Sequence, residues 1–165
     1  SAYTQEYCDE IYIGNVIHGE RTGRGKYYYK NAVYEGDWKS NKREGNGVLF
    51  FNHKLFYDGS WEADEFNGFG KGYQKGSLNY AGYWKNNLRS GFGVWRYSPR
   101  GAYVGEFKKH LYNGVGYIVV DGSIVQSGRW FDGELAEKIS AKDVIKKLRL
   151  AYPFYDSCRN IIIDN

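Results

Sequence analysis

The side chains able to do chemistry are few and are scattered along the chain. There are three histidines and two cysteines; His18 stands alone, and Cys8 and Cys158 lie near opposite ends without partners at metal-ligand spacing. His53 and His110 fall in expected turns, which favours turn side chains over metal ligands. We therefore expect no metal site. We also expect two reduced thiols, because a disulfide would have to join distant parts of the chain.

Groupings of residues typical of catalysis are missing as well. No Gly-x-Ser-x-Gly motif occurs, and neither cysteine has a histidine nearby in sequence. The segment Gly68–Lys71 is only superficially like a phosphate-binding loop, because Glu65 stands where Gly is needed and no Ser or Thr follows. Glu35 and Asp37 have the types of an acid and a base, but the same alternation recurs along the chain and indicates a solvated strand face. We expect a non-catalytic protein with no cofactor.

The composition favours β-strands joined by many tight turns. The 165 residues include 17 Tyr, 9 Phe and 5 Trp, which favour strands, and 22 Gly against 2 Pro, which indicates recurring special backbone positions. Basic and acidic residues, 23 and 19, are interspersed, giving a net charge of +4 without a large field of one sign. Rings interleaved with Lys and Arg are able to stack single-stranded nucleic acid, but acidic residues on the same strands would repel phosphate, so no nucleic-acid partner is expected.

No apolar run approaches the length of a membrane span, and the first residues lack the basic and apolar regions of a signal peptide. The expected location is therefore cytoplasmic, with association to a membrane or the cytoskeleton left open.

One pattern repeats along the chain at almost constant spacing. An aromatic residue is followed two positions later by Gly and eleven positions later by Gly-x-Gly, and the step between copies is 22 residues once and 23 thereafter. The five full copies begin at Tyr12, Tyr34, Tyr57, Tyr80 and Tyr103. A sixth copy, starting at Gln126, keeps Trp130 and Gly133 but loses the Gly-x-Gly, as expected of a terminal cap.

Each copy has the features of one β-hairpin. Tyr, Gly and a large apolar residue stand two positions apart, so they share one face of an extended strand. Three residues after that apolar position come types that tolerate left-handed backbone: Gly19, Asn41, Asp64, Asn87, His110 and Gly133. A second turn follows between copies, for example at Asn52-His53 and Asp121-Gly122. The prediction is an all-β array of antiparallel hairpins that pair into one elongated, twisted, single-layer sheet over residues 1–133.

These residues resemble a known repeat family. The pattern Tyr-x-Gly-x-Trp followed by Gly-x-Gly, over roughly residues 12–133, is similar to the MORN repeat, named for membrane occupation and recognition nexus. Two departures are the Gly expected after the Trp, replaced in copies two to five, and the missing Gly-x-Gly of copy six. The resemblance implies a curved sheet used for scaffolding, for docking partner peptides or helices, and in some relatives for binding membranes or phosphoinositides. It also leaves open a regulatory arm of an enzyme, such as a methyltransferase or lipid kinase, whose catalytic domain lies elsewhere.

Residues 134–165 change to a helical pattern and are predicted to form a tail. A helix is expected at about 141–151, with Ser140 as its N-cap and Pro153 beyond its end. Its apolar stripe indicates a cap over the last hairpin, and its basic stripe offers the alternative of binding an acidic membrane or a partner. The membrane candidates are Lys142, Lys146, Lys147 and Arg149. For the segment Asn160–Ile163 we expect either a docked edge strand or an adhesive chain end.

The leading functional hypothesis is a scaffold or adaptor that holds a peptide or amphipathic helix of a partner protein in an aromatic groove. The first candidates are Tyr28, Phe50 and Tyr73, with Arg96 as a polar anchor. The alternative row, if the Gly face lies open, is Trp38, Trp61 and Trp84. Unpaired sheet edges at both ends also lead us to expect a homodimer.

Overall fold

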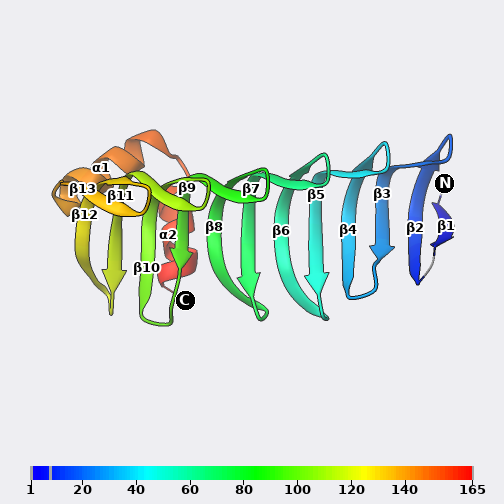
Figure 1. The fold of residues 1–165 in the computed structure, drawn as a ribbon, viewed down its shortest axis with the longest axis horizontal. Helices are drawn as coiled ribbons and strands as arrows, with labels where there is room; N and C mark the ends of the chain where they lie inside the picture. Colours follow the sequence, from blue (N-terminus) through cyan, green and yellow to red (C-terminus); the bar gives the residue numbers. More distant parts are fainter. Residues whose placement is uncertain (1, 8, 165) are drawn as a thin grey trace. The chain divides into compact units, whose positions relative to one another are not determined.

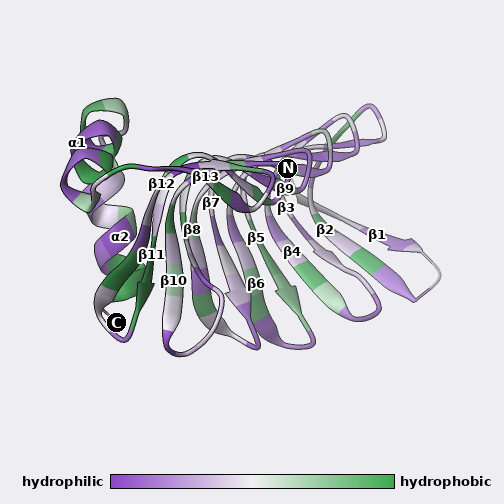
Figure 2. Cartoon of the chain, turned by 60° about the vertical axis from the view of Figure 1, so that its left-hand side comes forward, coloured by the Kyte–Doolittle hydropathy of each residue, from purple (hydrophilic) through white to green (hydrophobic). Residues whose placement is uncertain are grey.

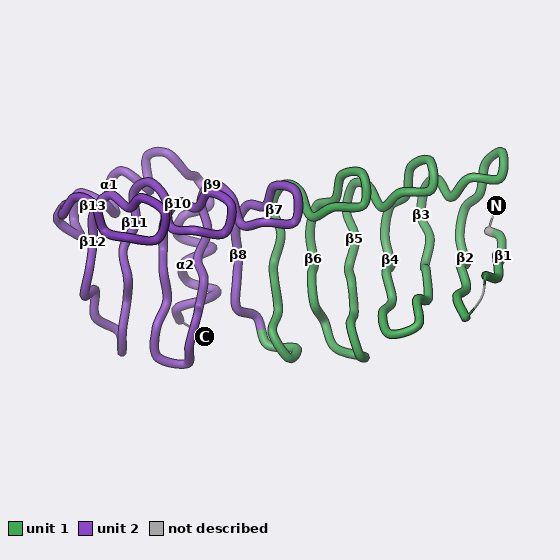
Figure 3. The backbone as a smooth tube through the Cα atoms, in the orientation of Figure 1, with its two compact units in different colours: residues 1–77 green, residues 78–165 purple. Residues whose placement is uncertain are grey.

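The computed structural model describes residues 2–7 and 9–164, arranged in two compact units, Ser1–Ser77 and Leu78–Asn165 (Figure 3). Each unit is built from antiparallel strands that pair in the order in which they follow one another along the chain. The predicted fold class, an array of β-hairpins with a short helix at the C-terminal end, is confirmed (Figure 1).

The first unit contains seven strands. They are β1 (Ala2–Tyr7), β2 (Glu10–Ile17), β3 (Glu20–Tyr28), β4 (Ala32–Lys39), β5 (Lys42–Phe51), β6 (Lys54–Glu62) and β7 (Glu65–Gln74). Each pairs with the next in an antiparallel register. Strand β1 was not predicted, because it precedes the first copy of the repeat and lacks its glycines.

The second unit contains the remaining strands and two helices. They are β8 (Ser77–Lys85), β9 (Leu88–Arg96), β10 (Gly101–Lys108), β11 (Leu111–Val120), β12 (Ser123–Phe131), β13 (Glu134–Lys138), α1 (Ala141–Ala151) and α2 (Tyr155–Ile163). The helix expected at about 141–151 is α1, and the Ser140 hydroxyl accepts a hydrogen bond from the Asp143 backbone amide at 3.2 Å. The tail predicted from residue 134 therefore holds one strand and two helices.

The prediction for Asn160–Ile163 was wrong, because this segment lies in α2 rather than in a strand or a loose end. Tyr155, Cys158 and Ile162 are buried, and their spacing is that of one helix face. Burial against the sheet thus overrides the strand preference of the isoleucine run. Cys158 is a buried thiol, whereas Cys8 lies outside the described residues.

The turn predicted inside each copy is confirmed at every position. The six predicted residues all have positive φ, between 67° and 90°. The residue before each also has positive φ, between 46° and 52°. Two consecutive left-handed residues make the two-residue turn that matches the twist of hairpin strands.

In both units a core of stacked rings lies on the face that carries the leading tyrosines, here called the Tyr face. The Tyr34 ring lies over the paired Gly36 and Gly47, and its hydroxyl donates to the Asp37 carbonyl at 2.7 Å. The Trp61 ring meets Tyr34 edge to face at 5.1 Å and donates from Nε1 to the Gly47 carbonyl at 3.0 Å. Each copy is thereby bound to the next by a ring contact and a hydrogen bond.

The second unit repeats this arrangement. Tyr103 is fully buried, its hydroxyl donates to the Glu106 carbonyl at 2.9 Å, and Trp130 stands edge to face with it at 5.8 Å. Trp130 Nε1 donates to the Gly116 carbonyl at 2.9 Å. The glycine two positions after each leading tyrosine and the second glycine of each Gly-x-Gly are required because a Cβ there would collide with the tyrosine ring or the facing backbone, whereas the first glycine of each Gly-x-Gly has positive φ.

The turn residues also connect neighbouring copies. The Asn41 side chain accepts from the Arg21 backbone amide at 2.9 Å, and the Asp64 side chain accepts from the Arg43 amide at 2.8 Å. In the second unit the His110 Nδ1 accepts from the Arg89 amide at 2.9 Å. The residue at this turn position, where it is Asn41, Asp64 or His110, therefore both tolerates positive φ and accepts a hydrogen bond from the preceding copy.

Candidate functional site

The face opposite the Tyr face, here called the back face, carries one continuous apolar row in the first unit. Strand register places Ile11 opposite Tyr28, Tyr28 opposite Val33, Val33 opposite Phe50, and Phe50 opposite Leu55. The row thus has one apolar side chain on each strand from β2 to β6, and Tyr73 on β7 lines a hollow together with Leu55. We call these six residues the open row.

The open row is accessible to a partner. Ile11 is 40% exposed and Phe50 36%, and the other four side chains are half-buried. Large apolar side chains gathered in a line on a surface are typical of interaction sites, whereas single ones are not.

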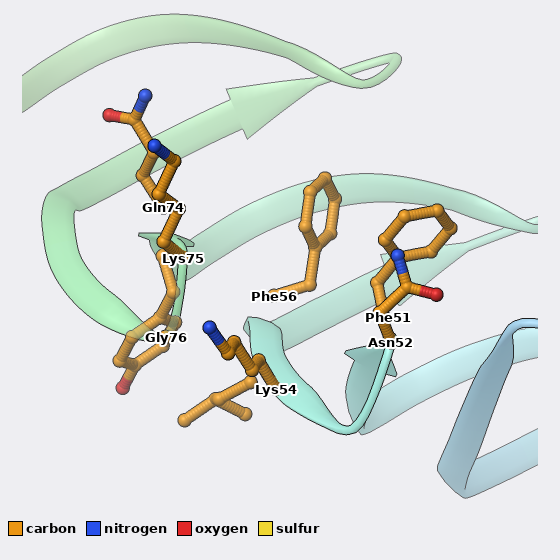
Figure 4. A pocket seen from close by; sticks show the side chains of 9 residues that line it. Phe51, Asn52, Lys54, Phe56, Gln74, Lys75 and Gly76 are labelled. Carbon is orange, nitrogen blue, oxygen red and sulfur yellow. The ribbon is translucent and has the colours of Figure 1, made fainter.

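Two hollows lie along the open row, each between the tips of neighbouring hairpins. The larger, of about 480 Å³, is lined by Leu55 and Tyr73 together with Phe51, Phe56, Lys54 and Lys75. Figure 4 shows the last four of these side chains. The smaller, of about 210 Å³, is lined by the following residues: Tyr28, Tyr29, Lys30, Asn31, Ala32, Val33, Phe50, Asn52 and His53. Their linings contain lysines and a histidine but no carboxylate.

Towards the middle of the strands the back face of the first unit becomes polar. The next row in register consists of Ile13, Lys26, Glu35, Val48, Asp58 and Lys71. Charges of both signs stand in this row, which keeps this part of the face hydrated. The apolar part of the back face is therefore narrow, and it runs across the strands rather than along them.

In the second unit the corresponding rows are covered by the helices. Val94 and Val104 occupy the middle row and are completely buried. The Tyr152 ring stacks on Phe92 at 5.0 Å, and the Tyr155 hydroxyl is hydrogen-bonded to that of Tyr117 at 2.6 Å. Figure 2 shows α1 and α2 lying against this unit. The same face is thus closed by the chain itself in one unit and left open in the other.

The structure brings together three of the predicted binding residues and separates the fourth. Tyr28, Phe50 and Tyr73 all belong to the open row. Arg96 does not, because it lies in the second unit and donates to the Ile162 carbonyl at 3.1 Å beneath α2. Its expected role as a polar anchor for a partner is therefore taken by a contact within the chain.

The alternative row of tryptophans is not open to a partner in this structure. Trp38 and Trp61 are only 4% and 3% exposed, and their indole nitrogens are hydrogen-bonded to glycine carbonyls. Trp84 is half-buried, and its ring meets that of Tyr80 at 5.0 Å. The Gly face is filled by its own rings, so the condition for this row to bind a partner is not met.

Three residues of the open row were not predicted from the sequence. Ile11 and Val33 each stand one position before a leading tyrosine, so strand alternation alone could have placed them on the back face. Leu55 stands two positions before Tyr57, and alternation predicts the wrong face for it. A β-bulge between Leu49 and Phe50 shifts the register and brings Leu55 opposite Phe50.

The basic residues proposed for membrane contact lie on α1. Lys142, Lys146 and Lys147 are exposed, while Arg149 donates to the Asp156 carboxylate at 3.0 Å. Leu150 beside them is 79% exposed. Within the part of the chain that the structure describes, no helix is long and apolar enough to cross a membrane.

The titratable groups near the open row are suited to binding. Burial, followed by the nearby Asp58 carboxylate, raises the pKa of Tyr73, so its phenol is neutral and able to donate a hydrogen bond at physiological pH. Among residues 2–7 and 9–164, no three His, Cys, Asp or Glu side chains are grouped so as to hold a metal ion. The arrangement provides apolar contact area with a basic rim.

Comparisons with known proteins agree with the repeat geometry. The family model for the MORN repeat matches residues 12–31, 34–52, 57–71, 80–101 and 103–119, which are the five complete copies. MORN repeat-containing protein 3 of Xenopus laevis is 33% identical over 67 residues, 36% of this chain. The match spans 28% of the length of that relative. Because the family model covers more than half of the chain, the chain belongs to the MORN repeat family.

Proposed function

We propose that this chain is a non-catalytic MORN-repeat adaptor that binds a segment of a partner protein along the open row. The observation that carries this proposal is the contrast between the two units. Equivalent repeat positions are covered by α1 and α2 in the second unit and are exposed or half-buried in the first. This face of the first unit has the same backbone and keeps large apolar side chains, and no element among residues 2–7 and 9–164 covers it. It is therefore suited to a cover supplied by another protein.

The types of side chain support this function. Tyr28, Phe50 and Tyr73 offer large contact areas with few rotatable bonds, so fixing them in a complex costs little conformational entropy. The glycine-rich strands behind them are held by the buried Tyr–Trp stack, so the surface is preorganised before binding.

A second candidate function is peripheral attachment to an acidic membrane through α1. The specific observation in its favour is the exposed Leu150 beside Lys146 and Lys147. Attachment of this kind depends steeply on salt, whereas binding to the open row is mainly apolar and tolerates salt.

Site-specific photo-crosslinking distinguishes the two functions. A benzoylphenylalanine is placed at Phe50 or, as a control, at Phe131, which is 64% exposed and belongs to the second unit. In native extract we expect protein adducts at position 50, retained in high salt, and few at position 131. Equal labelling at both positions contradicts the adaptor proposal. Recovery of acidic vesicles in low salt only, abolished by Lys146→Glu with Lys147→Glu, supports membrane attachment instead.

A further inference from the structure

We infer that the partner segment is an amphipathic α-helix that crosses the strands of the first unit, fills the two hollows with side chains seven residues apart, and carries carboxylates towards the hairpin tips. This inference rests on the proposed function and specifies the chemistry of its partner.

The spacing of the hollows favours a helix over an extended segment. The hollows lie in successive gaps between hairpins, so they are two strands apart, or about 9.6 Å at the usual strand separation. Helix residues i and i+7 lie on one face and are about 10.5 Å apart along the axis. Same-face residues of an extended chain are about 6.7 Å or 13.4 Å apart, and neither spacing matches.

The polarity of the back face sets the direction in which the helix lies. In the second unit α2 follows strand β9, since Tyr155 lies 5.7 Å from Phe92, ring to ring, and the Ile162 carbonyl binds Arg96. That orientation needs apolar residues along the strand, and Val94 provides the middle one. In the first unit a helix placed the same way would bury the charged middle row at a high desolvation cost. A helix that crosses the strands follows the apolar row instead.

The rim of the hollows specifies the charge of the partner. Lys30, Lys54 and Lys75 stand at the hairpin tips, and no carboxylate lines either hollow. Along β3 to β7 the carboxylates nearest in register, Glu35 and Asp58, lie on the other side of the open row, and Glu6 stands opposite Ile11 at the β1 end of the row. Glu or Asp on the tip side of the helix is therefore attracted to the rim, and Lys or Arg there is repelled.

The length of the row specifies the length of the helix. From Ile11 on β2 to Tyr73 on β7 there are five strand steps, or about 24 Å. A helix of about 16 residues spans that distance.

The experiment uses the full chain and three synthetic fluorescent helical peptides of identical length. The first has Phe at i and i+7 and Glu along one flank of the apolar stripe. The second has Lys in place of Glu, and the third has Phe at i and i+4. Fluorescence anisotropy is expected to show the first peptide binding at least tenfold more tightly than either of the others. Comparable affinities among the three peptides overturn the inference.

Variants of the chain locate the binding site. Phe50→Asp is expected to lower the affinity for the first peptide at least tenfold. Leu150→Asp on α1 is expected to leave that affinity unchanged. Because Phe50→Asp carries some risk for folding, a second variant reverses two exposed charges, Lys54→Glu with Lys75→Glu, and is expected to exchange the preference between the Glu and Lys peptides. An unchanged preference in that variant overturns the inference. If position 50 crosslinks a partner in extract while no peptide shows the i, i+7 preference, the helix inference fails and the adaptor function stands.

Discussion

The packing of the leading tyrosine on the glycine pair makes Gly47→Ala a sharp test of how the repeat is stabilised. A Cβ at this position would collide with the Tyr34 ring, at its hydroxyl, Cε1 and Cζ atoms. The ring is fully buried between Trp38 at 5.2 Å and Trp61 at 5.1 Å, so it has no free space in which to move. The methyl group can therefore be accommodated only by displacing the ring and its hydrogen bond to Asp37.

The expected loss of stability is about 1–3 kcal/mol. Overpacking of a buried site costs about 1–3 kcal/mol, and the lost hydrogen bond adds about 1 kcal/mol. Against these, alanine restricts the unfolded chain and restores about 0.4–1 kcal/mol. If Tyr34 is first replaced by Leu, the collision disappears, and Gly47→Ala should then cost close to nothing.

The assay is a double-mutant cycle of Gly47→Ala and Tyr34→Leu, measured by urea unfolding followed through tryptophan fluorescence. Asn46→Ala serves as the control, because this neighbouring side chain is exposed and only its backbone amide, bound to Asp37, is used by the fold. The control is expected to change stability by less than about 0.5 kcal/mol. A loss from Gly47→Ala that is equal with and without the tyrosine would refute the role assigned to the ring.

Two further predictions concern the second unit. Burial, and after it the Arg89 charge, lowers the pKa of His110, so the neutral ring that accepts from the Arg89 amide stabilises the fold above the unfolded pKa of 6.5, and this stabilisation is lost as pH falls through the lowered value. Thermal unfolding between pH 7 and 5 should show this loss of stability. His110→Asn supplies the same type of acceptor as Asn41 and should make the stability depend less on pH in that range. Arg96→Ala removes donors from the last carbonyls of α2 and should speed amide hydrogen exchange in α2 without changing exchange in β2–β6, whereas unchanged exchange in α2 would contradict this capping role.

Much of the fold follows from local sequence, because each turn is fixed by residues that tolerate positive φ and each strand by alternation. Asn41 and His110 illustrate this, since their backbone conformation and their position three residues after the apolar residue were both expected. The buried Tyr–Trp stack also follows from the two-residue spacing of Tyr34, Gly36 and Trp38. Strand β1 has none of these signals and could not be predicted from the repeat.

The candidate site was predicted only in part, because it depends on contacts between distant segments. Tyr28, Phe50 and Tyr73 share a face by alternation, and the structure places them on one row. Arg96 has the same place in its copy, but α2, sixty-six residues further along, covers it. Leu55 joins the row through a β-bulge, which shifts register without an obvious signature in the sequence.

The two faces of the repeat are under different physical constraints, so substitutions on one face affect stability more than those on the other. On the Tyr face, leading tyrosines contact a ring of the next copy, as Tyr34 does with Trp61 and Tyr103 with Trp130, so a substitution there costs stability in two hairpins at once. On the back face, neighbouring residues meet only across strand pairs, so Val94 of the second unit and Lys26 of the first occupy equivalent places on the same backbone. The wide apolar back face of the second unit holds α1 and α2, and the narrow one of the first unit, with its charged border, is the surface that we propose binds a partner. If the open row binds the partner as proposed, a change of partner requires substitutions only on the back face of the first unit, where they leave the stacked core intact.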